Sequence, residues 1–294
     1  MNLPAHIHYL VGVDGGGTST RARITRTDGA VLGEGQAGAS GLVHGQVQAW
    51  QHIQLAIQRA VEASTPSTLP APNPSNCALG IGVAGFNNAA WRTQFLASNP
   101  GYAHLAADTD AFTALLGAHR GQPGALVIAG TGTVALALHA DGTRRAAGGW
   151  GFPSGDDGGG AILGMRAVNL AQHVVDGLRP ASPLSRAVLA AVGDSADALL
   201  DWCCAASQSD FATLVPLVFD TEDHDALAAQ LLREAVQAVE QLAAAVDPQG
   251  TLPLVLWGSI AQRLAPRLAA TTQARLTTPQ GDALDGALTL SFSH

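Results

Sequence analysis

The apolar and polar positions in the first part of the chain predict alternating strands and helices. Short apolar runs of the kind found in strands cover residues 9–13, 20–25, 30–35, 78–84 and 103–107. Apolar positions recur at helical spacing over residues 46–63, 88–97 and 109–119. Because a strand-rich start is followed by strand–helix units, this part of the chain predicts an α/β sheet.

The second part begins with two more strands and then becomes strongly helical. The strand patterns cover residues 125–129 and 134–138. Ala- and Leu-rich helical patterns cover residues 158–176, 184–192, 196–206 and 224–246. A strand at 252–256, a helix from Ser259 and a short helix at 282–288 complete the prediction. The apolar stripe of the helix at 224–246 indicates core packing rather than a partner surface.

One strand–turn–strand pattern occurs twice. Each copy has an apolar strand, a turn of glycine and threonine, a second strand and an Asp–Gly hairpin. The two turns consist of Gly15, Gly16, Gly17 and Thr18, and of Gly130, Thr131, Gly132 and Thr133. Such an internal repeat predicts two similar, strand-rich α/β domains around a central cleft.

The domain boundary is expected near residues 117–124, where a Gly–Gln–Pro–Gly stretch precedes the second repeat. We therefore expect an N-terminal domain over residues 1–118 and a C-terminal domain over residues 119–294, the second with a helical insertion. The last helix is expected to pack back onto the N-terminal domain. The length of 294 residues is consistent with two domains, because single domains usually have about 100–200 residues.

The chemistry of the two turns points to a nucleotide. Glycines let a polyphosphate approach the backbone, successive amides form an anion-binding concavity, and threonine hydroxyls add donors. Either turn alone would be ordinary hairpin chemistry, but two in the same context favour phosphate binding. The chain contains no lysine, which excludes a classical P-loop. A bound nucleotide would then need amides, hydroxyls and a divalent cation, with Asp14 as the carboxylate that positions the cation through its waters.

Net charge and cysteine content narrow the possible partners. The formal charge is −8 and the arginines form no basic run, which argues against nucleic acid and anionic membranes and favours a small soluble substrate. Cys77 and the adjacent Cys203 and Cys204 show neither a disulfide framework nor metal-ligand spacing. No apolar run approaches the roughly 18–20 residues of a membrane span, and no secretory leader is evident, so we expect a cytoplasmic protein.

Two aspartates lie where the strand at 103–107 meets the following helix. In open α/β sheets, ligands bind at this carboxyl end of the strands. Asp108, Thr109 or Asp110 is expected to cap the helix, because Asp and Thr are preferred at that position. One cap does not need two aspartates, so we expect one of them to have a functional role.

A glycine-rich segment over residues 148–160 combines an aromatic ring with paired carboxylates. It contains Trp150, Gly151, Asp156 and Asp157 and precedes a long helical pattern. Rings that pack on apolar sugar faces and carboxylates that accept hydroxyl protons are common in sugar sites, so this segment predicts a ligand loop. A helix cap alone would explain one aspartate but not the density of glycine. The turn at Gly258 and Ser259 is a weaker signal, whose glycine would permit close approach of a flat group such as adenine.

Together these motifs resemble the BadF/BadG-type ATPase and N-acetylglucosamine kinase family. The matching segments are residues 13–18, 109–111, 129–133, 149–151, 154–158 and 258–260. They occur in the family's order, and the resemblance extends from Gly12 to Leu288. Within the family the sequence is most similar to bacterial glucosamine kinases, through residues 110–111, 115–119, 176–180, 258–263 and 282–288. The resemblance implies the two-domain fold of actin, sugar kinases and heat-shock-chaperone ATPases.

The resemblance also implies roles for individual residues. Asp110 matches the family's catalytic aspartate, which takes a proton from the attacking sugar hydroxyl. ATP and Mg²⁺ are the implied cofactors, with Asp14 as the residue that organises the metal. The implied nucleotide contacts are Gly15, Gly16, Gly17, Thr18, Gly130, Thr131, Gly132, Thr133, Gly258 and Ser259. The implied sugar contacts are Asp110, Thr131, Trp150, Gly151 and Asp156, to which the paired carboxylate Asp157 is added.

One departure leaves the substrate open. Where the family has a sugar-contacting asparagine, this chain has Gly38, Ala39, Ser40 and Gly41. We expect phosphorylation of D-glucosamine at its 6-hydroxyl, with N-acetylglucosamine as the alternative. Asp157 beside Asp156 would favour the ammonium of free glucosamine over an acetamide.

Other classes of protein share this fold. A redox-linked ATPase would need cysteines for an iron–sulfur cluster, and the three cysteines do not supply that pattern. A sugar sensor would need an output module, and no basic helix-turn-helix precedes Tyr9. A homodimer is compatible with the sequence, which does not fix the oligomeric state.

Overall fold

The computed structural model describes residues 3–64 and 69–292. It divides into two compact units. The first comprises Met1–Pro123 and Thr278–His294, and the second Gly124–Thr277. The first unit thus extends to Pro123, beyond the expected boundary after residue 118, because Gly121 and Gln122 form turns that bond back to the helix before them. The C-terminal segment, expected within residues 119–294, is counted with the first unit.

A mixed five-stranded sheet forms the centre of the first unit. Its strands, in the order β3-β2-β1-β4-β5, are β1 (Tyr9–Gly15), β2 (Ser19–Arg26), β3 (Val31–Gly38), β4 (Cys77–Val83) and β5 (His104–Asp108). β1 pairs with β2 in antiparallel and with β4 in parallel orientation. The helices of this unit are α1 (Gln46–Glu62), α2 (Ala89–Ala97), α3 (Asp110–Ala118) and α12 (Ala283–Leu290), with a 3₁₀ turn at Leu42–His44.

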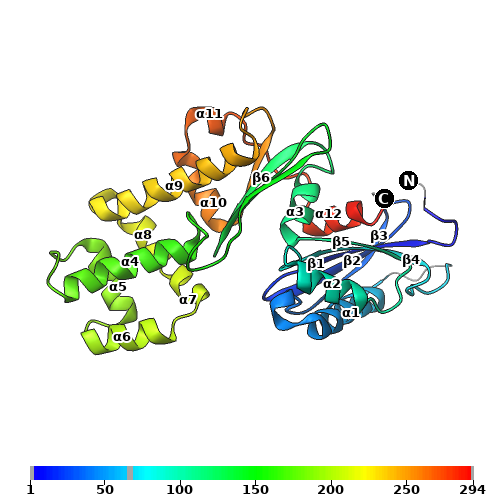
Figure 1. Cartoon of the computed structure of the whole chain (residues 1–294), viewed down its shortest axis with the longest axis horizontal. Coiled ribbons are helices and arrows are strands. Elements are labelled where there is room, and N and C mark those ends of the chain that lie inside the picture. The colour runs from blue at the N-terminus through cyan, green and yellow to red at the C-terminus, as the bar shows by residue number, and fades with distance from the viewer. Residues whose placement is uncertain (1–2, 65–68, 293–294) are drawn as a thin grey trace. The chain divides into compact units, whose positions relative to one another are not determined.

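The central strands β1 and β4 are buried on both faces, for different reasons. On one face, alternate residues of β1 pack against the apolar stripe of α1, which includes Trp50 and Ile53. On the other face, Gly12 and Gly80 leave room for the backbone of α12, since a Cβ at Gly80 would lie 1.9 Å from the Ala287 carbonyl oxygen. Figure 1 shows α12, in red, beside α3 and the strands of this unit. The last helix therefore completes the core that positions α3.

A four-stranded sheet repeats the same topology in the second unit. Its order is β8-β7-β6-β9, and β6 again pairs with one antiparallel and one parallel neighbour. The strands are β6 (Gly124–Ala129), β7 (Thr133–Leu138), β8 (Arg144–Gly148) and β9 (Leu254–Trp257). The shared arrangement confirms the predicted duplication of strand-rich α/β domains.

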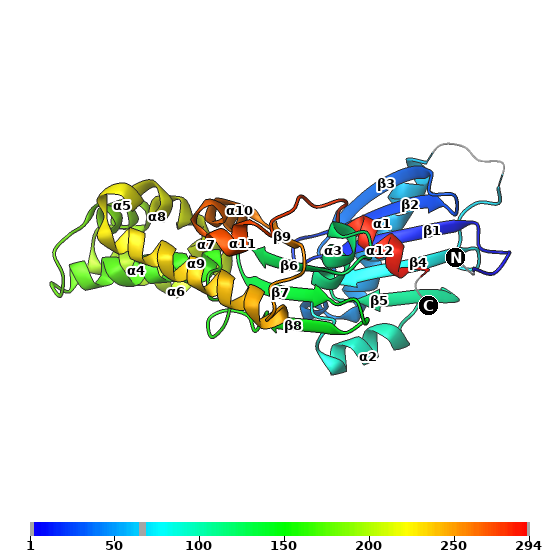
Figure 2. The same cartoon turned by 90° about the horizontal axis from the view of Figure 1, so that it is seen from above.

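Helices make up most of the second unit. They are α4 (Gly160–Val175), α5 (Pro183–Val192), α6 (Ala196–Ala205), α7 (Gln208–Thr213), α8 (Val215–Thr221), α9 (Ala226–Val246), α10 (Ser259–Leu264) and α11 (Ala270–Gln273), with 3₁₀ turns at Glu222–His224 and Ala265–Arg267. Figure 2 shows α9 running along the strands of this sheet, and its buried stripe confirms the predicted core role. β8, α7, α8 and α11 were not predicted as separate elements.

Candidate functional site

The first glycine turn, residues 15–18, is hydrogen-bonded to a neighbouring segment of the chain. The Gly16 amide donates to the Ser19 carbonyl at 2.9 Å, and the Gly16 carbonyl accepts from the amides of Ser40 and Gly41 at 3.1 and 2.9 Å. The amides of Gly17 and Thr18 form no hydrogen bond within the described residues, and both residues are exposed. Two successive unpaired amides on a glycine turn are the arrangement that binds an anion.

The segment that lacks the family's asparagine has a structural role here. Ser40 and Gly41 brace the first turn through the two bonds to Gly16. Ser40 is buried, and its hydroxyl accepts from the Thr20 hydroxyl at 2.8 Å. Gly15 must lack a side chain because its Cβ would lie 2.5 Å from the Ser40 hydroxyl oxygen. This segment therefore fixes the shape of the turn.

Asp14 lies at the end of β1, directly before the first turn. Its Oδ2 accepts from Arg21, with Nη2 at 2.8 Å and Nε at 3.3 Å. Arg21 also lies 3.5 Å from Asp282, at the start of α12. Within the described part of the chain, Oδ1 of Asp14 has no hydrogen-bonding partner, and the side chain is 22% exposed. One free carboxylate oxygen beside a glycine turn with two free amides suits Mg²⁺, which usually combines one or two carboxylates with waters and phosphates.

Arg21 is a residue that the sequence analysis missed. It lies opposite Asp14 in the β1–β2 register. The hairpin pattern and the length of the turn already place these two residues on neighbouring strands, so their opposite charges were a detectable signal. Asp282, which is far away in sequence, gave no such signal.

Thr109, one of the three residues expected to cap the helix, is the N-cap of α3. Its hydroxyl accepts from the Phe112 amide at 3.1 Å. The two flanking aspartates are thus not needed for the cap: Asp108 accepts from the Thr109 amide at 2.7 Å and Asp110 from the Ala111 amide at 2.9 Å. Both carboxylates remain at the carboxyl end of β5, where a ligand site is expected.

The environment of Asp110 favours a proton-accepting role. Burial raises the pKa of Asp110 above the ordinary aspartate value, and the negative charge of Asp14 raises it further, although the bond from the Ala111 amide lowers it. Asp110 is therefore a stronger base than an exposed aspartate. A catalytic base works best when its pKa is shifted toward the working pH.

The second glycine turn repeats the design of the first. Its carbonyl oxygens are occupied, because Gly130 accepts from the Gly160 amide at 2.8 Å and Thr131 from the Ala161 amide at 2.9 Å. The amides of Thr131 and Gly132 have no hydrogen-bond acceptor among the residues that the structure describes. Both repeats therefore present two successive free amides.

The predicted ligand loop lines a cavity of about 350 Å³ within the second unit. Trp150, Asp156 and Asp157 lie at this cavity together with Thr133, and α9 contributes Gln241 and Leu242. Its volume falls within the range of small-molecule sites, roughly 300–1,000 Å³. Trp150 is 86% exposed, so its ring is available to a ligand. The contribution of α9 was not predicted.

The two adjacent aspartates of this loop differ sharply. The side chain of Asp157 is 70% exposed, with the Arg166 guanidinium at 3.4 Å. Asp156, expected to face the sugar, is only 7% exposed, and its carboxylate accepts from the Thr133 amide at 3.2 Å and from Gln208 at 3.5 Å. The structure thus directs Asp156 toward the second turn and leaves Asp157 open to solvent.

Gly258 separates β9 from α10 and adopts a positive φ of 97°. A Cβ at this position would lie 2.5 Å from the Ala129 carbonyl oxygen. The sequence analysis expected this glycine to admit adenine, whereas the close neighbour in the structure is the backbone before the second turn. Gly258 therefore brings Ser259 and the start of α10 next to that turn.

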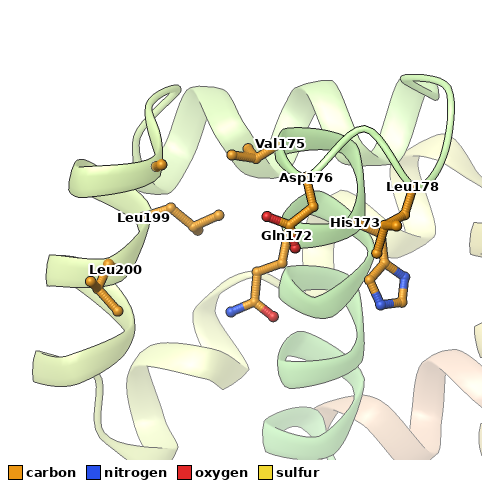
Figure 3. Close-up of a pocket in the computed structure, with 8 residues that line it drawn as sticks. Gln172, His173, Val175, Asp176, Leu178, Leu199 and Leu200 are labelled. Carbon is orange, nitrogen blue, oxygen red and sulfur yellow. The ribbon is translucent and has the colours of Figure 1, made fainter.

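A separate cavity of about 400 Å³ lies among the helices of the second unit (Figure 3). Leu199 of α6 points toward Gln172 and Asp176 across it. It contains none of the predicted site residues. Within residues 3–64 and 69–292, no cluster of three or more His, Cys, Asp or Glu side chains could hold a metal, and no helix is long and apolar enough to cross a membrane.

Comparison with known proteins finds a matching family and several similar proteins. The profile of the BadF/BadG/BcrA/BcrD ATPase family matches residues 11–276. The chain is 34% identical to the glucosamine kinase GspK of Vibrio cholerae, over 96% of this chain and 95% of that protein. It also resembles the crystal structure of a candidate N-acetylglucosamine kinase from Chromobacterium violaceum, with 44% identity, a TM-score of 0.89 and coverage of 97% and 99%.

A more distant structure supports the fold alone. The ROK-family glucokinase of Streptomyces griseus is 15% identical, with a TM-score of 0.52 over 96% of this chain and 98% of that one. These similarities confirm the predicted two-domain fold of actin-like ATPases and sugar kinases.

Proposed function

The chain belongs to the BadF/BadG/BcrA/BcrD ATPase family, and from this premise we propose that it phosphorylates the 6-hydroxyl of D-glucosamine with ATP. The observation that carries the proposal is the pair of glycine turns, each with two free amides, together with the half-buried Asp110 at the start of α3. The near full-length similarity to a glucosamine kinase supports the choice of sugar. An ATP-dependent kinase of this kind works from the cytoplasmic ATP pool, so we propose that location.

In the proposed reaction Asp110 acts as the base. Its carboxylate accepts the proton of the 6-hydroxyl while that oxygen bonds to the γ-phosphorus of ATP. The bond from the γ-phosphorus to the bridging oxygen breaks, and ADP leaves with the electron pair. Phosphoryl transfer of this kind depends mainly on position and on neutralised charge.

The remaining residues bind and orient the reactants. Free amides of both turns hold phosphate oxygens, and Ser259 lies at the adenosine. Oδ1 of Asp14 would hold Mg²⁺ through its waters, and that ion would neutralise charge on the phosphates. Trp150 and Gly151 meet the sugar ring, and Thr131 contacts both the nucleotide and the sugar, as the family resemblance implies.

Asp157 is proposed to distinguish free glucosamine from its acetylated form. Its carboxylate is exposed and adjoins the cavity beside Trp150, so it can attract an ammonium group. N-acetylglucosamine remains the second candidate, because the 44% identical crystal structure is of a candidate kinase for that sugar.

The deciding experiment is ADP formation with Mg²⁺ and a panel of sugars: D-glucosamine, N-acetylglucosamine, N-acetylmuramic acid, glucose and no sugar. The product is identified by mass. Turnover with glucosamine well above the other sugars supports the proposal, and preference for N-acetylglucosamine supports the second candidate. Sugar-independent ATP hydrolysis, or none, contradicts both. The mass of the native protein would show whether it is a homodimer.

A further inference from the structure

The Asp156 carboxylate has a side-chain donor from a distant part of the chain. Gln208 is the first residue of α7, and its Nε2 donates to Oδ2 of Asp156 at 3.5 Å. We propose that Gln208 is a positioning residue that holds the Asp156 carboxylate in the orientation in which it accepts a sugar hydroxyl. The inference rests on the proposed kinase function, in which Asp156 is the sugar contact that the family resemblance implies. The helix α7, which the sequence did not predict, then belongs to the sugar site.

Asp156 has room for a ligand beside its protein partners. It lines the cavity of about 350 Å³ that is also lined by Trp150. The Thr133 amide donates to Oδ1 at 3.2 Å and Gln208 donates to Oδ2, which occupies two of the roughly four acceptor positions of a carboxylate. The remaining positions can accept from sugar hydroxyls. The carboxylate can therefore serve as a ligand without losing either contact.

Gln208 restricts the rotation of this carboxylate. The terminal torsion of an aspartate side chain has broad minima, so a single bond to Oδ1 fixes it poorly. Within the part of the chain that the structure describes, Gln208 is the only residue that donates to Oδ2. A second donor sets the plane of the carboxylate, and with it the direction of the acceptor positions that remain free.

Close packing fixes the backbone from which Gln208 extends. A Cβ at Gly164 of α4 would lie 1.8 Å from the Phe211 carbonyl oxygen, so α7 lies directly on α4. The first turn of α7 is capped, because the Ser207 hydroxyl accepts from the Asp210 amide and the Asp210 carboxylate accepts from the Ser207 amide. A helix of six residues depends on such contacts, since its own hydrogen bonds are few. Gln208 therefore starts from a fixed position.

Aromatic contacts join α7 to the loop that carries Asp156. The rings of Phe152, in that loop, and Phe211 of α7 have centroids 5.6 Å apart. The Trp202 ring meets Phe211 edge-on, with centroids 5.2 Å apart. Such aromatic pairs contribute stability beyond their buried area. The loop and α7 are thus joined by a ring contact as well as by the hydrogen bond, and Gln208 keeps its place relative to Asp156.

The first measurement compares the KM for glucosamine in the full chain, from ADP formation at saturating ATP and Mg²⁺. Gln208→Ala is expected to raise this KM about three- to tenfold, the range for one net hydrogen bond, with kcat within about twofold of wild type. Gln208→Glu keeps the size of the side chain but puts a second carboxylate beside Asp156, so its KM should rise at least as much. The affinity for ADP with Mg²⁺, measured without sugar, should stay within about twofold in both variants. Gln58→Ala, which breaks a bond of the same kind to Glu62 at 2.8 Å on the exposed face of α1, is the matched control.

A double-mutant cycle separates the positioning of Asp156 from an independent structural effect. If Gln208 acts through Asp156, adding Gln208→Ala to Asp156→Ala should change the KM by less than about twofold, because the residue that it positions is already absent. In any variant whose turnover is too low, glucosamine affinity measured by titration calorimetry with ADP and Mg²⁺ replaces the KM. An undiminished effect of Gln208→Ala in the Asp156→Ala background would overturn the proposal.

An unchanged KM in Gln208→Ala would also contradict the role. If Gln208→Ala does not fold, Gln208→Glu carries the test, and a wild-type KM in that variant rejects the role. A wild type that phosphorylates no sugar would refute the kinase function instead, whereas an active wild type with unchanged variants refutes only the role of Gln208. If N-acetylglucosamine is the preferred sugar, the same comparisons are made with it.

Discussion

Replacing Asp110 with Asn is expected to stop turnover without disturbing the fold. The amide oxygen of Asn can still accept from the Ala111 amide, as Oδ1 of Asp110 does at 2.9 Å. The cap of α3 is untouched because Thr109 provides it. What Asn cannot do is accept the proton of the sugar hydroxyl. Folding and nucleotide binding should therefore remain, and only the chemical step should slow.

The magnitude follows from the role of a general base. Such a base contributes about 10²–10⁴ in rate, and each factor of ten corresponds to about 1.4 kcal/mol of transition-state stabilisation. A loss of about 3–5 kcal/mol is therefore expected for Asp110→Asn. The loss should appear in kcat, with little change in the affinity for ADP.

The pH dependence of the wild type provides a second measurement. Burial, assisted by the charge of Asp14, raises the pKa of Asp110 above its usual value near 4. The base is active only when deprotonated, so kcat should fall as pH decreases through this raised pKa. The acid limb should thus lie above pH 4 and should disappear in the residual activity of Asp110→Asn.

The assay couples ADP release to a spectroscopic signal, with circular dichroism to check the fold. Asp108→Asn is the matched control, because it alters a neighbouring carboxylate at the same strand end. Activity of Asp110→Asn within threefold of wild type would refute the assignment. Loss of activity in Asp108→Asn alone would move the base two residues upstream.

Three further variants test other parts of the structure. Asp157→Asn should reduce the preference for glucosamine over N-acetylglucosamine, measured as the ratio of their kcat/KM values, by about fivefold at most. The limit follows because an exposed charge contributes about 0.2–1 kcal/mol. An unchanged ratio would contradict the proposed role of Asp157 in distinguishing the two sugars. Asp225→Ala should lower the free energy of unfolding by about 2–4 kcal/mol in urea titrations, since it removes the cap of α9 and leaves the buried Leu184 amide unpaired. Gly286→Ala should lower the free energy of unfolding by about 1–3 kcal/mol or more, because its Cβ would lie 1.7 Å from the Thr113 carbonyl oxygen. An unchanged melting temperature would argue against the close packing of α12 on α3.

Local patterns predicted most of the elements that carry the site. The hairpins, both glycine turns and the strand end before Asp110 are encoded within a few residues, where alternation and turn chemistry act directly. The short helices α7 and α8 were missed, because six or seven residues give too few turns for a periodic signal.

Contacts between residues far apart in the sequence could not be predicted from the sequence alone. The direction of the Asp156 side chain depends on Gln208, 52 positions later, and Asp282 reaches Arg23 from 259 positions away. A single sequence carries no signal for such pairs. The glycine-rich loop with its paired aspartates was therefore predictable, but not which of the two aspartates is buried.

The free amides of the two turns would let a chain without lysine hold the proposed nucleotide. A glycine turn left to itself would pair its own amides and carbonyls or be solvated. Here the carbonyl of Gly16 is occupied by Ser40 and Gly41, and those of Gly130 and Thr131 by the start of α4. Because outside donors satisfy the carbonyls, the amides stay available and aligned. Affinity then depends on the supporting segments as much as on the turns, so mutations that loosen a support should weaken nucleotide binding as strongly as the loss of a direct contact.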